Sequence, residues 1–210
     1  MQKAIQLHQN DFYFRTYAQI YLFKLNTLIS KQTALTEDEK VLLQSYFDEA
    51  VNASNLAISY DKENYLNYDM LGAVYNTAAG LGVKDAYNKS IEAYLQASKL
   101  NPKNPALKLA ISKNYFADNK IKEAKDFAKE SIALKPNYTL GLIFLSQLEK
   151  NQGNHTEAVM YAEQALSTVP GDKDVLQYLN SLKGNGGNIT PSTTTEPITE
   201  TEKKEDKKTN

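Results

Sequence analysis

The sequence contains no cysteine and only two histidines among 210 residues. The lack of cysteine excludes disulfides, thiolate metal sites and a cysteine nucleophile, and it is compatible with any cellular compartment. An excess of charge of one sign is also missing, because 24 basic residues nearly balance 25 acidic ones. The composition therefore predicts no nucleic-acid partner and no attraction to an anionic membrane surface.

Long hydrophobic runs are scarce as well. In the first thirty residues the longest apolar run is Ile20 to Phe23, which is too short for a secretory signal or a membrane span. The sequence as written therefore predicts a soluble chain that does not insert into a membrane by itself, cytoplasmic by default. Its 41% of apolar residues can still supply a core.

No motif indicates catalysis. His8 and His155 have no carboxylate or second imidazole at ligand spacing, and the serines are scattered without a histidine partner. The "GLG" of residues 80–82 does not follow a strand, so turn geometry explains its glycines better than a phosphate loop does. We therefore predict a protein that is not an enzyme and that has no cofactor and no metal.

The chain does contain a regular period. Pro102, Pro136 and Pro170 lie 34 residues apart, each between two helix-like segments. Small residues recur at fixed offsets before the prolines, where they would let two helices of a hairpin approach closely. Asn104 and Pro105 have the form of a helix cap and first helical residue, and residues 118–119 and 151–154 the form of turns between helices.

These features resemble the tetratricopeptide repeat (TPR). The family's pattern is present in one unit as Tyr68, Leu71, Gly72, Tyr75, Ala97 and Pro102. The next two units carry Ser112 and Ser146 in place of the glycine, and the last has Glu149 in place of the second tyrosine. The resemblance implies an all-α fold, a right-handed TPR-type solenoid of about three full repeats.

The repeat register also locates two insertions. The marker positions Ala4, Ala57, Ala97, Ser131 and Ala165 are separated by 53, 40, 34 and 34 residues. The first excess, of nineteen residues, predicts an extended helical hairpin from segments 11–30 and 36–60, the second of which opens with a Thr36 to Glu39 capping box. The second excess, of six, predicts a widened turn at about Ala78 to Val83, with positive backbone angles at Gly80 and Gly82 and a helix from Lys84.

This register divides the chain into a repeat domain and a tail. The domain is expected to end in a capping helix with Asp172 as its cap and an apolar face of Val175, Leu176, Leu179 and Leu182. The tail, rich in threonine, proline and mixed charge, is expected to be disordered. The expected ranges are a TPR domain at 1–183, divided into a partial repeat 1–11, then 12–64, 65–104, 105–138, 139–172 and the capping helix 173–183, and a tail at 184–210.

The expected working surface is the groove lined by the first helix of each pair. Some TPR proteins clamp acidic chaperone C-termini with Lys, Asn and Arg on successive inner helices, but the matching positions here include Asp69, Ala73 and Ala110, so that clamp is not implied. We instead expect an apolar concave groove for a protein or peptide segment, in a non-enzymatic scaffold. The predicted groove residues are Met70, Leu109, Lys113, Phe116, Leu140, Ile143, Phe144 and Gln147. The same side chains would alternatively pack only against neighbouring helices.

Two alternatives stay open. The array is similar to the soluble TPR region that follows the membrane part of bacterial O-antigen ligase or polymerase-like proteins, which would tether it to a membrane. In that case Met1 is not a true start, since the register begins inside a repeat. The second alternative is self-association through the N-terminal repeat face, near Ile5, Phe12 and Tyr17.

Overall fold

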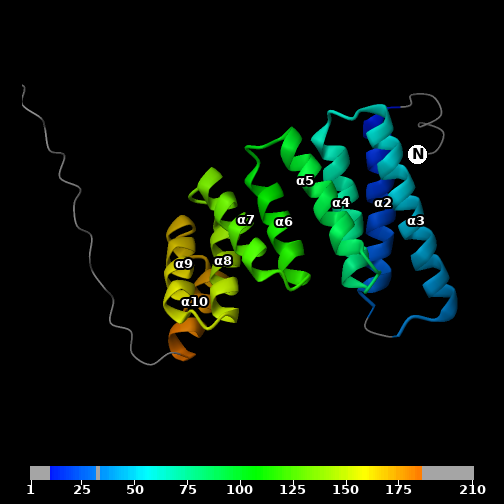
Figure 1. Ribbon diagram of the computed structural model, residues 1–210. Coiled ribbons are helices and arrows are strands. Elements are labelled where there is room, and N and C mark those ends of the chain that lie inside the picture. The colour runs from blue at the N-terminus through cyan, green and yellow to red at the C-terminus, as the bar shows by residue number, and fades with distance from the viewer. Residues whose placement is uncertain (1–9, 32–33, 186–210) are drawn as a thin grey trace, which may run out of the picture.

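The computed structural model describes residues 10–31 and 34–185 (Figure 1). The predicted partial repeat before residue 10, including Ile5, and the predicted tail from residue 186 onward lie outside this part. The described residues form helices joined by short turns and contain no strand. The helices are α2 (Asp11–Ile29), α3 (Glu37–Tyr60), α4 (Tyr65–Gly80), α5 (Ala86–Leu100), α6 (Pro105–Ala117), α7 (Ile121–Leu134), α8 (Thr139–Asn151), α9 (His155–Thr168) and α10 (Lys173–Asn185).

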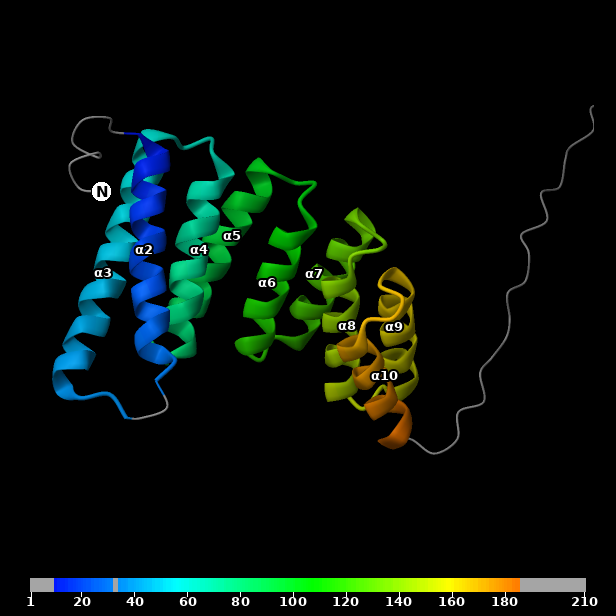
Figure 2. The ribbon, with the colours of Figure 1, turned by 180° about the vertical axis from the view of Figure 1, so that it is seen from behind.

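The helices stack as hairpins in chain order. Pairs α2 with α3, α4 with α5, α6 with α7 and α8 with α9 each pack closely, and the second helix of each pair also contacts the next pair. In Figure 2 the first helices α2, α4, α6 and α8 follow one another along the stack, and α10 lies at its end. This arrangement confirms the predicted all-α helical-repeat solenoid.

Side-chain caps start several helices. The Asn10, Asn64 and Asn104 side chains accept backbone hydrogen bonds at the starts of α2, α4 and α6, and Pro105 is the first residue of α6. Thr36 and Glu39 form the predicted capping box at the start of α3. These caps satisfy N–H groups that a helix leaves unpaired, so polar residues in the sequence fix where the helices begin.

The first insertion lengthens both helices of the first hairpin. Helix α2 has 19 residues and α3 has 24, whereas α6 has 13 and α7 has 14. Figure 1 shows this long hairpin at one end of the stack. The predicted extended hairpin is therefore present.

The second insertion is shared between helix and turn. Helix α4 has 16 residues and continues to Gly80, and α5 begins at Ala86 instead of the expected Lys84. Positive φ values occur at Gly82 (80°) and Asp85 (59°), so the expectation for Gly82 is correct and that for Gly80 is wrong. Gly80 keeps a helical backbone because the extra turn of α4 absorbs part of the excess.

One hydroxyl group bridges the two helices of each of three hairpins. Ser112 Oγ donates to the Ala124 carbonyl at 2.5 Å, and Ser146 Oγ donates to the Ala158 carbonyl at 2.5 Å. In the second hairpin the bond runs the other way, since Ser90 Oγ of α5 donates to the Gly72 carbonyl of α4 at 2.8 Å. Where serine replaces the glycine of the first helix, a hydrogen bond between the two helices is therefore kept, but its donor lies on the first helix instead of the second.

Gly72 is required for the packing of a large ring. A Cβ added there would lie 2.8 Å from two ring carbons of Tyr94, and Tyr94 is itself buried. At the equivalent positions of α6 and α8, Ser112 and Ser146 are fully buried. The missing side chain at Gly72 therefore leaves room on α4 for the Tyr94 ring of α5, whereas α6 and α8 carry a serine side chain at this position.

Helix α10 closes the described end of the array. Asp172 Oδ1 accepts hydrogen bonds from the backbone N–H groups of Asp174 and Val175, as expected for its cap. Leu179 and Leu182 are buried against α9, whereas Leu176 is exposed. The face of α10 that packs is therefore narrower than the sequence predicted.

Candidate functional site

Four of the predicted groove residues come together between α6 and α8. Leu109 and Phe144 belong to a buried cluster, and Phe116 packs against it with its ring 5.8 Å from that of Phe144 in an edge-to-face arrangement. The Lys113 Nζ lies 5.8 Å from the centroid of the Phe144 ring. Leu109 and Phe144 therefore have little surface left for a partner, and they support the surface from beneath.

The other predicted groove residues are more accessible. Leu140 is 60% exposed, Gln147 is exposed, and Ile143 is half-buried. Of the four residues between α6 and α8, Lys113 is also exposed. Met70 is half-buried on α4, in the repeat before α6. No finding tests partner binding at any of these positions, so their role stays a prediction.

An exposed apolar side chain recurs at the second residue of the first helices. Phe12 of α2 is 57% exposed, Leu66 of α4 is 37% exposed, and Leu140 of α8 is 60% exposed, with the smaller Ala106 exposed at the same place in α6. Because these helices follow one another along the stack in the same direction, equivalent positions align across it. The row Phe12, Leu66, Ala106 and Leu140, which we call the apolar row, therefore marks one edge of this face.

A carboxylate lies near this row without a charged partner. Asp69 of α4 forms no ion pair with any residue in the described ranges, and burial raises the pKa of its carboxyl group. Desolvation of an unpaired charge opposes folding, so Asp69 contributes nothing evident to the stability of α4. A cationic group on a partner would relieve that cost.

Glu149 is a buried ionic contact. The residue is 3% exposed, its carboxylate lies 2.8 Å from Lys125 Nζ of α7, and Asn154 Nδ2 donates to that carboxylate at 2.7 Å. Burial alone would raise the pKa of Glu149, but the hydrogen bonds from Asn154 and Lys125 and the positive charge of Lys125 lower it below its usual value. The replacement of the family's tyrosine by Glu149 thus links α7, α8 and the turn before α9.

A second polar network joins the first two hairpins. The Asp11 carboxylate accepts hydrogen bonds from Arg15 at 3.0 Å and from Asn64 at 2.7 Å. Asn67, which is fully buried, donates to the Ala57 and Asp61 carbonyls and receives a hydrogen bond from Arg15 at 2.5 Å. These bonds fix α2 against the start of α4, so the long hairpin is held rigidly to the rest of the array.

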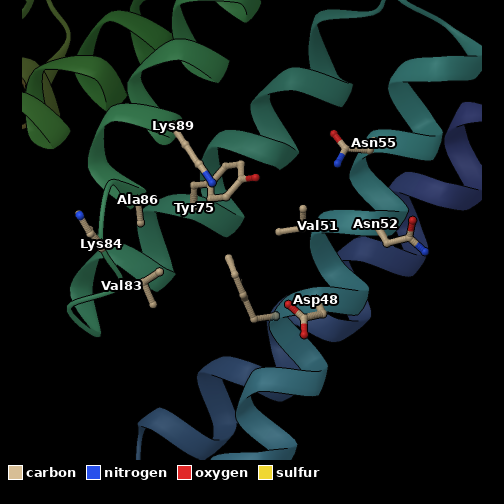
Figure 3. A pocket seen from close by; sticks show the side chains of 10 residues that line it. Asp48, Val51, Asn52, Asn55, Tyr75, Val83, Lys84, Ala86 and Lys89 are labelled. Atoms are coloured by element: carbon tan, nitrogen blue, oxygen red, sulfur yellow. The ribbon is translucent and has the colours of Figure 1, made fainter.

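The widened turn and helix α3 of the long hairpin enclose a cleft that the sequence did not predict. It has a volume of about 340 Å³ and lies between α3, the end of α4, the widened turn and the start of α5 (Figure 3). Phe47, Val51, Tyr75, Val83 and Ala86 supply its apolar lining. The polar lining consists of Asp48, Asn52 and Asn55 of α3, Lys84 of the turn and Lys89 of α5. We call this site the insertion cleft.

The repeat register assigned the two insertions to successive units, and this was the sign in the sequence that a feature forms where those units meet. The walls themselves depend on how α3 and α5 pack, which a period of residues does not reveal. A shallower depression of about 530 Å³ continues along α3, lined by Val41, Gln44, Ser45 and Glu49, and it shares Asp48 and Asn52 with the cleft. The combined site is therefore elongated.

The described residues contain no group of three or more His, Cys, Asp or Glu side chains that could hold a metal ion. Within the same ranges, none of the helices has the length and apolar character needed to cross a bilayer.

Comparison with known proteins gives limited sequence similarity. No model of a known protein family matches the chain. Part of the human (Homo sapiens) "Protein O-mannosyl-transferase TMTC1" is 28% identical over 116 residues. That stretch is 55% of this chain and 12% of the human protein, so the chain spans only a small part of that relative's length.

Solved structures agree in fold. TTC0263, a thermophilic TPR protein in Thermus thermophilus, has a TM-score of 0.59 at 17% identity, covering 80% of this chain and 96% of that one. MamA has a TM-score of 0.56 at 20% identity, covering 73% and 86%. The first TPR of Spaghetti (RPAP3), solved with the HSP90 peptide SRMEEVD, has a TM-score of 0.50 at 20% identity, covering 58% and 92%. At these identities the likeness concerns the fold, and the chain is therefore a helical-repeat protein with the tetratricopeptide-repeat fold.

Proposed function

We propose that this protein is a non-enzymatic scaffold whose first helices present an apolar surface to a protein or peptide segment. The apolar row carries the proposal, because three large apolar side chains remain exposed at equivalent positions where packing within the fold does not require them. Half-buried Ile143 and Met70 extend this surface, and exposed Lys113 and Gln147 offer polar contacts beside it. The RPAP3 structure, solved with a peptide, supports the idea that this fold suits such a role.

The chemistry of the surface favours an amphipathic segment. An apolar side of the segment would cover the row, as in helix-in-groove recognition. Asp69 would pair with a cationic group of the segment, which would offset the cost of its desolvation.

Replacing Leu66 and Leu140 by aspartate is expected to abolish partner capture without unfolding the protein, since both side chains are exposed. The measurement is affinity capture with quantitative mass spectrometry, together with thermal unfolding of each variant. The matched control replaces Leu95 of α5 and Leu134 of α7, which are 39% and 41% exposed on second helices. Partners lost equally from both variants, or retained by both, would contradict the proposal.

We also propose that the N-terminal face can associate with a second copy. Phe23 and Phe12 are the two most accessible apolar side chains of α2, at 72% and 57% exposed. Tyr17, which the sequence placed in this patch, instead makes an edge-to-face contact with Tyr21. Light scattering over a concentration series is expected to show a rise in mass that Phe23→Ser abolishes, whereas a strict monomer at high concentration would rule this association out.

A second candidate function is a repeat region of a larger protein of glycan assembly, of the O-antigen type in bacteria. The observation that favours this candidate is the similarity to part of an O-mannosyl-transferase. It assigns no catalytic residue to this chain, and it is compatible with the scaffold proposal because a repeat region would hold partners for the larger protein.

A further inference from the structure

We propose that the insertion cleft is a second binding site, distinct from the apolar row, and that it binds an extended polypeptide segment in which an aliphatic side chain is flanked by carboxylates. The widened turn supplies Val83 and Lys84 to the site, and α3 of the long hairpin supplies the opposite wall. Helix α3 has 24 residues and α7 has 14, and both end three residues after the markers Ala57 and Ser131, so the α3 residues that line the cleft lie just after the inserted part of that helix. A 34-residue repeat with a short turn would lack the inserted residues that include Val83.

The floor of the cleft suits one aliphatic side chain. Phe47 and Tyr75 meet edge to face with their ring centroids 6.0 Å apart, and Val51 and Ala86 complete the apolar lining. Val83 is 42% exposed at the rim of the cleft, where it would be covered by a bound segment. A volume of about 340 Å³ exceeds what one leucine or isoleucine side chain fills, so part of the segment's main chain also fits.

One wall of the cleft is cationic. Lys84 and Lys89 both line the cleft, and neither forms an ion pair within the part of the chain that the structure describes. In Figure 3 the Lys89 amine lies beside Tyr75, whereas the Lys84 amine lies further out, at the edge of the turn. Lys89 Nζ lies 5.4 Å from the centroid of the Tyr75 ring, which holds its charge above the apolar floor. A carboxylate next to the aliphatic side chain of the segment would be attracted to the Lys89 amine, and Lys84 adds positive charge at the rim.

The opposite wall offers amide groups. Asn52 and Asn55 line the cleft from α3, and their side chains form no hydrogen bond with another described residue. Asparagine is a poor helix former, so its presence twice on an exposed helical face is unfavourable for α3 itself. Free amide groups can both donate to and accept from the main chain of an extended segment.

The shape of the site distinguishes a polypeptide from a compact small molecule. The depression along α3 continues from the cleft through the shared Asp48 and Asn52, and it includes exposed Val41. Its acidic residues are Glu49 and Asp48, and Asp48 also lines the insertion cleft, on the α3 wall opposite the lysines. A bound segment would match the charges of the whole site if its carboxylates lay over Lys84 and Lys89 and its own lysines lay over the acidic residues of α3.

A synthetic peptide with the sequence EPITETEKK, taken from residues 196–204, has this chemistry and serves as the probe. The receptor is the full chain carrying Ile198→Ser, so that its own copy of the segment does not compete. Isothermal titration or fluorescence anisotropy is expected to detect binding that weakens with added salt. The same peptide with Ile replaced by Ser should bind at least tenfold more weakly.

Two receptor variants locate the site. Lys84→Glu with Lys89→Glu should weaken binding by at least tenfold, whereas the matched pair Lys103→Glu with Lys122→Glu, at exposed positions outside the cleft, should leave it unchanged. Asn52→Ala with Asn55→Ala should raise the melting temperature and yet weaken binding, a combination that a purely structural role does not produce.

Absence of binding at millimolar peptide overturns the proposal, as does binding that neither cleft variant changes. Leu66→Asp with Leu140→Asp should bind this peptide normally, because those residues are outside the cleft. The outcome at the cleft is therefore separate from the outcome for the apolar row.

Discussion

Replacing Gly72 by alanine is expected to destabilise the protein by about 2 kcal/mol, because overpacking a well-filled core costs roughly 1 to 3 kcal/mol. The new methyl group would lie 2.8 Å from the buried Tyr94 ring, which cannot move outward without losing its own packing. Urea unfolding followed by circular dichroism at 222 nm measures the change. This clash outweighs the gain in helix propensity that alanine normally brings over glycine.

The same helix provides the control. A Cβ at Gly80 meets nothing within 4 Å, and the backbone there is helical. Gly80→Ala should therefore stabilise the protein by up to about 1 kcal/mol, since alanine loses less backbone entropy on folding. Two identical substitutions in α4 are thus expected to have opposite signs, and a stabilising Gly72→Ala would refute the packing argument.

A double substitution tests the cause. In the Tyr94→Leu background the flat ring is absent, so Gly72→Ala should cost less than in the wild-type background. A coupling energy of about 1 kcal/mol is expected for side chains in direct contact. Additive effects would mean that Gly72 acts through something other than Tyr94.

Replacing Glu149 by alanine is expected to cost about 2 to 3 kcal/mol, since hydrogen bonds to charged groups contribute roughly 1.5 to 3 kcal/mol and their loss leaves partners unpaired. The change would free Lys125 of its contact at 2.8 Å and remove the acceptor for Asn154. Because α7 and α8 belong to successive repeats, unfolding should also become less cooperative. Glu130→Ala, in an exposed ion pair with Lys108, is the control and should change stability by less than about 1 kcal/mol.

The pH dependence of unfolding identifies the carboxylate. The pKa of Glu149 is lowered in the folded protein below its ordinary value of 4.5, so its contribution to stability is present above that pH and is lost as the pH falls through the lowered pKa. The wild-type protein should therefore lose more stability than Glu149→Gln between pH 6 and pH 3. Equal losses in both proteins would exclude Glu149 as a source of the acid sensitivity.

The two predictions concern two positions of the TPR pattern. Gly72 matches the pattern in one unit, and Glu149 departs from it. The sequence could show that Gly72 matches the pattern and that Ser112, Ser146 and Glu149 do not. It could not show that Ser90 donates to Gly72, or that Glu149 contacts Lys125, because these partners lie 18 and 24 residues apart on different helices. Each substitution has a physical partner that became visible only when the helices were packed.

The predicted groove illustrates the same limit. Helical spacing assigned Leu109, Phe144 and Leu140 to one face, and all three are on first helices. Packing then separated them, since Leu109 and Phe144 fill the space between α6 and α8 while Leu140 remains 60% exposed. A period of 3.6 residues gives the direction of a side chain from its own helix, but not how closely a neighbouring helix approaches.

By itself, the sequence determined the all-α repeat fold, the long first hairpin and the approximate position of the widened turn. These features follow from local rules, because caps, small residues at fixed offsets and the 34-residue period act within one hairpin or between neighbours. Only the tertiary structure decided which apolar residues are buried. It also decided that α4 continues to Gly80 and that Asp85 takes a positive φ before α5, and that α3 and α5 enclose a cleft. Those outcomes depend on the distance and angle between helices that are not adjacent in the pattern, and side-chain packing over the whole stack sets both.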